Sequence, residues 1–388
     1  MLLIVGAAVL SLFIWVYLLT ARGSFWQIGV NTAAPNTNKE FHGLVAVVVP
    51  ARNESDVVGE SVRSLLCQTG VHSVRIFLVD DCSTDGTAQV ARAAATAAGK
   101  LEALTIVEGT PLPSGWSGKL WATQQGLEKA REAAPRFVLL TDADIVHAPD
   151  SIATLISIAE TGPYDLVSFM VKLHCKTIAE KLLVPAFVFF FFMLYPPRWI
   201  ADRQRRTAGA AGGCILIRPE WLERIGGIVA IRSEIIDDCA LARRVKSAGG
   251  RLWVGLTPST RSIRPYNTLA EIGRMISRTA FNQLRHSVWL LIVSIFGLML
   301  TYLAPPLLLF SHHRAAWICG GLSCFAMMAA YLPMVRFYGL NPLWVFTLPL
   351  TAGFYMGATL HSAWRFWSGR GGEWKDRVQD PRQERVIE

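Results

Sequence analysis

The chain has 388 residues, of which 52% are hydrophobic and only 17% are charged, and its mean hydropathy is +0.34. An ordinary soluble domain of this length is more polar, so the composition points to membrane segments. The net charge of +9 suits an anionic membrane surface or an anionic substrate. Because no basic run is interleaved with aromatic residues, we expect no nucleic-acid partner.

The first predicted element is a membrane anchor at residues 1–22. Residues 2–19 carry no charge, and this run is just long enough to span a bilayer. No Lys or Arg precedes the run and Arg22 follows it, which indicates an anchor whose C-terminal side lies in the cytoplasm rather than a cleaved signal peptide. The seven dispersed cysteines, without a CxxC pair, are typical of reduced thiols in a cytosol-facing protein.

Residues 43–285 are more polar, and strands alternate with helices along them. Apolar runs at 44–49, 74–79, 103–109 and 136–144 predict strands, and helical spacing follows each of them, with Asp150 as the expected N-cap of the last helix. Strands that alternate with helices predict an α/β fold with a mainly parallel sheet. Such sheets bind ligands beyond the carboxyl ends of their strands.

Acidic residues follow two of these predicted strands. Asp80 and Asp81 come after the second, and Asp142 and Asp144 come after the fourth. Residues i and i+2 of an extended segment point to the same side, so Asp142 and Asp144 suit Mg²⁺ or Mn²⁺ shared with substrate phosphates. The alternative is a solvated loop.

Three further groups of residues carry candidate chemistry. Lys119 stands in a Gly- and Pro-rich stretch that suits phosphates, although an ordinary surface loop explains it too. Asp237 and Asp238 precede a helix, either as simple partners of its dipole or as a source of a general base. Arg274 and Arg278 share a helical face that suits either a diphosphate or lipid headgroups.

More apolar runs lie later in the chain, at about 288–310, 315–335 and 343–364, so residues 286–366 are predicted to form membrane helices before a polar tail at 367–388. The apolar stretch 182–195 is short for a span, and arginines follow it up to residue 206. An interfacial helix over 182–206 and a buried core helix remain equal alternatives. The number and orientation of the C-terminal spans stay open.

In this order, the motifs resemble those of family 2 glycosyltransferases with the GT-A fold. They are "VVVPARNE", "VDDCSTDGT", "TDAD" and the "DD" at 237–238, while "RMISRT" resembles the Q/R-x-x-R-W element of processive and lipid-directed members. The resemblance covers about residues 44–285, and the whole chain is similar to the hopene-associated glycosyltransferases of hopanoid-producing bacteria. It implies a multi-pass protein of the bacterial cytoplasmic (inner) membrane, with its catalytic domain in the cytoplasm.

The resemblance also implies roles for the candidate residues. Asp238 is expected to be the base of an inverting displacement, and Asp144 with Asp142 to hold Mg²⁺ or Mn²⁺. The expected donor is a nucleotide-diphosphate sugar, by family expectation linked to UDP. Residues expected to bind substrate are Asp80, Asp81, Lys119, Asp142, Asp237, Arg274 and Arg278.

Two positions depart from the family pattern. Met275 stands where Gln or Arg is expected, and Thr279 stands where a Trp is expected to stack on an acceptor sugar. These departures disfavour a polysaccharide synthase and favour a membrane lipid acceptor, with hopanoid biosynthesis as the specific expectation. Transfer to a polyprenyl phosphate is one alternative, and a non-catalytic membrane scaffold with a degenerate transferase domain is another.

Overall fold

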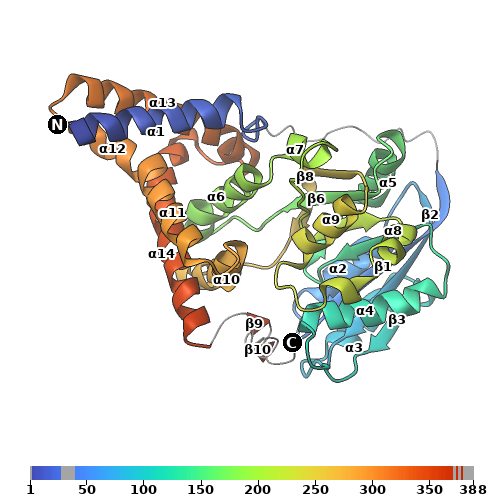
Figure 1. Cartoon of the computed structure of the whole chain (residues 1–388). Coiled ribbons are helices and arrows are strands. Elements are labelled where there is room, and N and C mark those ends of the chain that lie inside the picture. Colours follow the sequence, from blue (N-terminus) through green and yellow to red (C-terminus); the bar gives the residue numbers. More distant parts are fainter. Residues whose placement is uncertain (1, 28–39, 370–372, 375–376, 379–388) are drawn as a thin grey trace. The chain divides into compact units, whose positions relative to one another are not determined.

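The computed structural model describes residues 2–27, 40–369, 373–374 and 377–378 (Figure 1). The chain forms two compact units. We call the first the helical unit; it comprises Met1–Ile28, Cys175–Arg198 and Pro265–Glu373. We call the second the sheet unit; it comprises Gly29–His174, Trp199–Arg264 and Trp374–Glu388.

The sheet unit contains one eight-stranded sheet in the order β3-β2-β1-β4-β7-β6-β8-β5. Its strands are β1 (Phe41–Ala51), β2 (Val71–Asp80), β3 (Leu104–Glu108), β4 (Phe137–Thr141), β5 (Ile145–Val146), β6 (Leu166–Lys172), β7 (Cys214–Ile217) and β8 (Leu252–Ser262). Strands β1, β2, β3 and β4 pair with one another in parallel, and β6 pairs in parallel with β8. Strand β7 is antiparallel to β4 and β6, and β5 is antiparallel to β8. The mainly parallel α/β sheet predicted from the sequence is confirmed.

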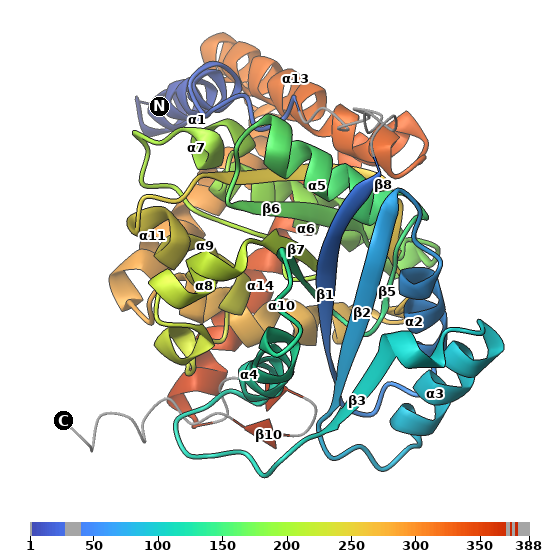
Figure 2. The ribbon, with the colours of Figure 1, turned by 90° about the vertical axis from the view of Figure 1, so that its right-hand side faces the viewer.

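Helices cover both faces of the parallel part of this sheet (Figure 2). The helices of the unit are α2 (Val58–Leu66), α3 (Thr87–Ala97), α4 (Gly118–Arg131), α5 (Ser151–Thr161), α8 (Pro219–Arg224) and α9 (Asp237–Ser247), and the short helix α7 (Pro197–Ala201) begins at the boundary. Val45, Val47 and Val49 of β1 pack in one buried cluster with side chains of α2, α3 and α5.

The opposite face of β1 contacts α4. A Cβ atom added at Gly126 of α4 would lie 2.6 Å from Val48 and 2.8 Å from Val79, so the absent side chain lets this helix lie directly on the sheet. Since successive side chains of a strand point to opposite faces, burial on both sides explains the uninterrupted valine run. This packing fixes α4, and with it Lys119, against the carboxyl end of β1.

The helical unit is built from apolar helices. They are α1 (Leu2–Thr20), α6 (Ile178–Leu194), α10 (Leu269–Gln283), α11 (Val288–Leu298), α12 (Ala304–Leu308), α13 (Arg314–Phe337) and α14 (Leu348–Trp367), with a π-helical turn at Met299–Leu303. Among the described residues, five helical stretches are long and apolar enough to cross a membrane: Leu2–Thr20, Ile178–Ala201, Val288–Leu308, Arg314–Phe337 and Pro342–Trp367. The expected N-terminal and C-terminal apolar helices are therefore present.

Inside the helical unit, polar side chains donate hydrogen bonds to backbone carbonyls at the π-helical turn and in the proline-containing helix α6. The Trp15 indole Nε1–H donates to the carbonyl of Thr301 in the π-helical turn, at 2.8 Å. In α6, which contains Pro185, the carbonyls of the preceding turn accept hydrogen bonds from the Thr351 and Tyr355 hydroxyls of α14. The carbonyl that Pro185 leaves without its helical donor is that of Lys181, so these two hydroxyls add contacts beside the proline and join α6 to α14.

Two stretches that the sequence assigned to the catalytic domain belong to the helical unit. They are 175–198, with α6, and 265–285, with α10. Helix α6 starts at Ile178 rather than 182, so together with α7 it is longer than the stretch considered short for a span. Its Phe189 and Phe192 are fully buried. The predicted end of the catalytic domain at residue 285 thus differs from the boundary of the sheet unit at Arg264. The reason is that α6 and α10 bury their apolar faces against other helices of the helical unit. The predicted tail lies largely outside the described residues.

Candidate active site

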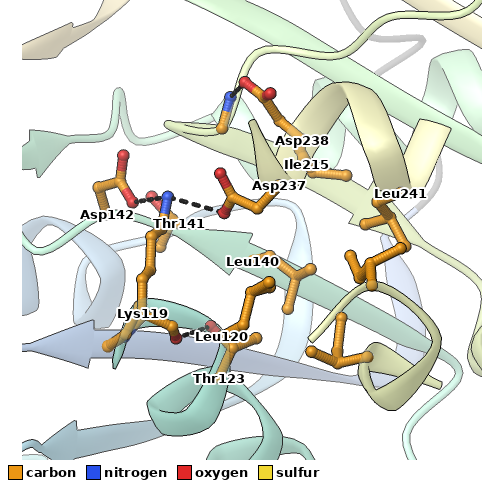
Figure 3. A pocket seen from close by; sticks show the side chains of 14 residues that line it. Lys119, Leu120, Thr123, Leu140, Thr141, Asp142, Ile215, Asp237, Asp238 and Leu241 are labelled. Atoms are coloured by element: carbon orange, nitrogen blue, oxygen red, sulfur yellow. Dashed lines mark hydrogen bonds and ion pairs between the residues drawn. The ribbon is translucent and has the colours of Figure 1, made fainter. Parts of the chain in front are cut away.

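Three acids and a lysine meet beyond the carboxyl ends of the parallel strands (Figure 3). Lys119 Nζ lies 2.8 Å from Asp142 Oδ1 and 3.2 Å from Asp237 Oδ2. Asp142 follows β4, Asp237 begins α9, and Lys119 stands in the first turn of α4, whose N-cap Ser117 accepts a hydrogen bond from Leu120 N–H. Lys119, Asp142, Asp237 and Asp238 line one small crevice. Residues predicted separately from the sequence are therefore brought together.

The charges in this crevice depend on one another. Burial opposes the charge of the Lys119 ammonium, but the carboxylates of Asp142 and Asp237 outweigh that effect and raise its pKa. Burial also raises the pKa of Asp142, and nearby Asp144 adds to this while Lys119 opposes it. Lys119 is thus a cation that partly offsets the effect of burial on the pKa of the neighbouring acids.

Asp238 is held by two backbone donors. Gly212 N–H donates to its Oδ2 at 2.8 Å, and Cys239 N–H donates to its Oδ1 at 2.6 Å. A Cβ atom added at Gly212 would lie 3.3 Å from this Oδ2 and 3.4 Å from Lys119 Nζ, so only glycine lets the backbone approach both groups freely. Burial and the adjacent Asp237 carboxylate raise the pKa of Asp238 to about 6, with Lys119 and the two backbone donors opposing them. A carboxylate with such a pKa is a suitable general base near neutral pH.

Asp144 is held by residues at the end of β8 that the sequence analysis did not identify. Ser262 Oγ donates to its Oδ2 at 2.7 Å, and Arg264 Nε lies 3.4 Å from the same oxygen. Arg264 also pairs through its other guanidinium nitrogen with Glu54, which is nearly buried at the turn after β1. Arg264 thereby links the β1 turn to the predicted metal ligand.

Asp142 and Asp144 are the two carboxylates of the "DAD" turn that the sequence analysis assigned to a divalent cation. Lys119 Nζ lies beside Oδ1 of Asp142, and Ser262 Oγ and Arg264 Nε lie beside Oδ2 of Asp144. In the described part of the chain, no cluster of three or more His, Cys, Asp or Glu residues is arranged to hold a metal. Two carboxylates are a common protein share of a Mg²⁺ shell, which phosphate and water complete.

Asp80 and Asp81 lie at the end of β2 in different environments. Asp80 Oδ1 accepts a hydrogen bond from Ser83 N–H and lines a surface pocket of about 410 Å³ together with Arg92 and Glu108. The side chain of Asp81 is fully buried, with Arg52 Nη1 at 3.9 Å from its Oδ2. Asp80 is therefore the more accessible of the two to a ligand.

Arg274 and Arg278 lie on α10, in the helical unit. Both side chains are exposed, while Ile272 and Ile276 of the same helix are buried. The predicted shared face therefore exists. The role assigned to the two arginines at a diphosphate stays a prediction.

The sequence analysis missed a buried polar group behind the Asp142 turn. His147 Nε2 lies 3.0 Å from Thr141 Oγ1, and the Thr141 hydroxyl donates to the Gly213 carbonyl at 2.8 Å. The only signal in the sequence was a histidine and a threonine flanking "DAD", which does not show that they meet. Asp150, expected to cap α5, stands at the N-cap position but makes no capping hydrogen bond with its side chain.

Comparison with known proteins gives the family and the fold of the chain. The sequence profile described as "Glycosyltransferase like family 2" matches residues 42–282, which is more than half of the chain. The fold is similar to that of the mannosyltransferase PcManGT from Pyrobaculum calidifontis, solved in complex with GDP-Man and Mn²⁺. That likeness has a TM-score of 0.56 at 20% sequence identity and covers 94% of this chain and 96% of the other.

Two characterised relatives match over shorter segments. An undecaprenyl-phosphate 4-deoxy-4-formamido-L-arabinose transferase from Pseudomonas fluorescens is 31% identical over 126 residues, covering 32% of this chain and 34% of the relative. A 4,4'-diaponeurosporenoate glycosyltransferase from Staphylococcus aureus is 32% identical over 118 residues, covering 30% of this chain and 28% of the relative. The matched segments thus span about a third of the length of these relatives.

Proposed function

Because the chain belongs to the family 2 glycosyltransferases, we propose that it transfers a sugar from a nucleotide-diphosphate sugar to a membrane lipid, with inversion at the anomeric carbon. The observation that carries this proposal is the position of Asp238. Its carboxylate is fixed by Gly212 N–H and shares one crevice with Lys119 and Asp142. A carboxylate suited to act as the base and a cation thus lie at the edge where parallel sheets bind ligands, which supports the proposal.

The proposed reaction is a single displacement. Asp238 removes the proton of an acceptor hydroxyl as that oxygen attacks the anomeric carbon of the donor. The new C–O bond forms while the bond from the anomeric carbon to the diphosphate oxygen breaks, and the nucleoside diphosphate leaves with the electron pair. Attack from the side opposite the leaving group inverts the configuration.

The leaving diphosphate gains negative charge, and the residues around Lys119 are suited to stabilise it. Lys119 Nζ, now 2.8 Å from Asp142, supplies one positive charge. Asp142 and Asp144 would hold Mg²⁺ or Mn²⁺, which supplies further positive charge to the diphosphate. The structure of the Pyrobaculum protein with GDP-Man and Mn²⁺ supports a divalent metal, while the base of the nucleotide, with UDP as the family expectation, is part of the proposal.

The proposed acceptor is a lipid because the described part of the chain contains five helical stretches long and apolar enough to cross a membrane. An enzyme held in the bilayer meets a lipid already concentrated and oriented there, which lowers the cost of bringing two reactants together. The two relatives, named for undecaprenyl phosphate and diaponeurosporenoate, support this class of acceptor. Hopanoids as acceptors, and a catalytic domain facing the bacterial cytoplasm, are parts of the proposal that rest on the sequence resemblance.

A polyprenyl phosphate is the second candidate acceptor, favoured by the undecaprenyl-phosphate relative. A phosphate monoester is already an anion and does not need a strong base to attack. Asp238→Asn would therefore remove transfer to a hydroxyl but preserve much of the transfer to a phosphate. This single variant separates the two acceptor classes.

The test is release of nucleoside diphosphate from a panel of nucleotide sugars, using the full chain in nanodiscs made with native lipids and Mn²⁺. We expect release with one donor and its loss in Asp238→Asn, and mass spectrometry of the lipids then identifies the acceptor. If no donor is cleaved and none binds in the presence of Mg²⁺ or Mn²⁺, the chain is a scaffold rather than an enzyme. Asp202→Asn serves as the control, because Asp202 is an exposed acid of the same unit outside the crevice.

A further inference from the structure

Behind the crevice lies a buried polar chain that the proposed reaction does not use directly. It consists of Thr141, His147 and Ser151, which are 2%, 3% and 2% exposed. His147 Nε2 lies 3.0 Å from Thr141 Oγ1, and its Nδ1 lies 3.2 Å from Ser151 Oγ. Gln68 Oε1 lies 3.3 Å from the same serine oxygen and also accepts from Ile152 N–H at 3.0 Å. The chain therefore begins in the α5 N-terminus and reaches the end of β4.

At the Thr141 end of this row of hydrogen bonds, the donor can be assigned. The Gly213 carbonyl can only accept, so the single hydroxyl proton of Thr141 is donated to it at 2.8 Å. Thr141 Oγ1 then offers only its lone pairs to His147 Nε2, 3.0 Å away. At the other end the Ser151 hydroxyl donates to Gln68 Oε1 at 3.3 Å, so a neutral His147 ring has one N–H to donate to either Thr141 or Ser151. Burial, which lowers the pKa of His147 to about 3, agrees with this neutral ring.

This row of hydrogen bonds lies next to two residues of the proposed active site. Thr141 immediately precedes Asp142, and Gly213 immediately follows Gly212, whose N–H holds Asp238 at 2.8 Å. One threonine hydroxyl therefore joins the backbone beside the donor-binding carboxylate to the backbone beside the base. Strand pairing already sets Thr141 opposite Cys214, but Gly212 and Gly213 precede β7 and have no side chain of their own to fix them.

We propose that Thr141 and His147 are positioning residues: the His147–Thr141–Gly213 hydrogen-bond chain fixes the 212–213 backbone, and so the base Asp238, relative to Asp142. This inference rests on the proposed function for its kinetic consequence. His147 Nε2 lies 3.0 Å from the Thr141 oxygen, and the Thr141 proton goes to the Gly213 carbonyl. Misplacing a base by about 1 Å costs on the order of 100-fold in rate without weakening ground-state binding equally.

The test compares Thr141→Val, which keeps the shape but removes the hydroxyl, with Thr141→Ser, which keeps the hydroxyl. We expect Thr141→Val to lower kcat on the order of 10- to 100-fold with KM for the donor changed less than about threefold. Thr141→Ser should recover kcat to within about threefold of wild type, and His147→Gln, whose amide N–H can still donate, should fall between them. The matched control is Thr260→Val, since the buried Thr260 hydroxyl makes no hydrogen bond in the described part of the chain.

Amide hydrogen exchange of the segment around Gly212 tests the same proposal without turnover. We expect faster exchange at residues 211–214 in Thr141→Val and wild-type exchange in Thr141→Ser and Thr260→Val. The proposal is overturned if Thr141→Val keeps wild-type kcat, if Thr141→Ser loses as much as Thr141→Val, or if exchange at 211–214 is unaffected. If the wild-type protein turns over no donor, the proposed function fails while the exchange result still decides the positioning role.

Discussion

Replacing Asp238 with Asn should make the sheet unit more stable at neutral pH while it removes the base. The pKa of Asp238 is raised from 3.8 to about 6 by burial and by Asp237. A folded-state pKa above the unfolded value means that the folded protein holds the proton more tightly, so stability falls as the pH rises from about 4 to about 6. At pH 7 the full penalty applies.

The size of this penalty follows from the pKa difference. The interval between 3.8 and about 6 corresponds to roughly 3 kcal/mol, which is an upper value because water still reaches this half-buried side chain. Asparagine removes the charge but offers one oxygen where Asp238 uses two, for Gly212 N–H and Cys239 N–H. Leaving one of these donors without its acceptor costs about 1–2 kcal/mol. The net expectation is a gain of about 1 kcal/mol, or a rise of about 2–4 °C in Tm.

The assay is thermal unfolding of wild type and Asp238→Asn in nanodiscs between pH 4 and pH 8, followed by tryptophan fluorescence. The stabilising effect of the variant should grow as the pH rises from about 4 to about 6 and level off above that. Near pH 4 the variant should be the less stable protein, because only the cost of the lost acceptor remains. In parallel, wild-type transfer to a hydroxyl acceptor should fall about tenfold per pH unit below about 6 and level off above it. A Tm difference that does not change with pH, or a transfer rate that is constant from pH 5 to pH 7, would refute the reasoning.

Three further substitutions test other parts of the site and the fold. Asp144→Ala should remove metal-dependent donor binding, measured by calorimetry with Mn²⁺, and unchanged binding would exclude Asp144 as a metal ligand. Lys119→Met should move the acid limb of the pH–rate profile to higher pH because Lys119 lowers the pKa of Asp238, whereas Lys119→Arg should keep it near the wild-type value. Phe190→Glu should unfold the helical unit, seen as loss of the folded peak in size-exclusion chromatography, because Phe190 is 8% exposed and packs against Tyr302 and Tyr355. Folded protein that merely leaves the membrane would favour an interfacial α6 instead.

The sequence predicted the parts of the site that depend on local order. Each valine-rich run forms a strand, and the carboxyl ends of parallel strands share one edge, so Asp80 and Asp142 could be placed there without a structure. Lys119 was also identified, although as part of a loop. It stands instead in the first turn of α4 and pairs with acids from two other elements.

The residues that the sequence did not reveal act through contacts between distant positions. Arg264 reaches Glu54 and Asp144, which lie far from it in the chain, and its charge resembles that of any surface arginine. Gly212 holds Asp238 through its backbone, which no side-chain pattern records. The sequence did not predict that α6 belongs to the helical unit. An apolar pattern indicates that a helix is buried, but it does not identify the helices that it packs against.

Each unit is built from segments that are separated in the sequence, and this has a consequence for synthesis at the ribosome. The chain passes between the units at the boundaries near residues 28, 174, 198 and 264, so α1 and α6 emerge before β7 and β8 exist. The sheet is complete only when β8 has paired with β6 on one side and with β5 on the other. Strands β1 to β4 must therefore persist with an unfinished edge while the apolar helix α6 emerges. Removing the C-terminal helices would take away the contacts of α6 and α10 with α14, so we expect a trimmed fragment to expose their apolar faces.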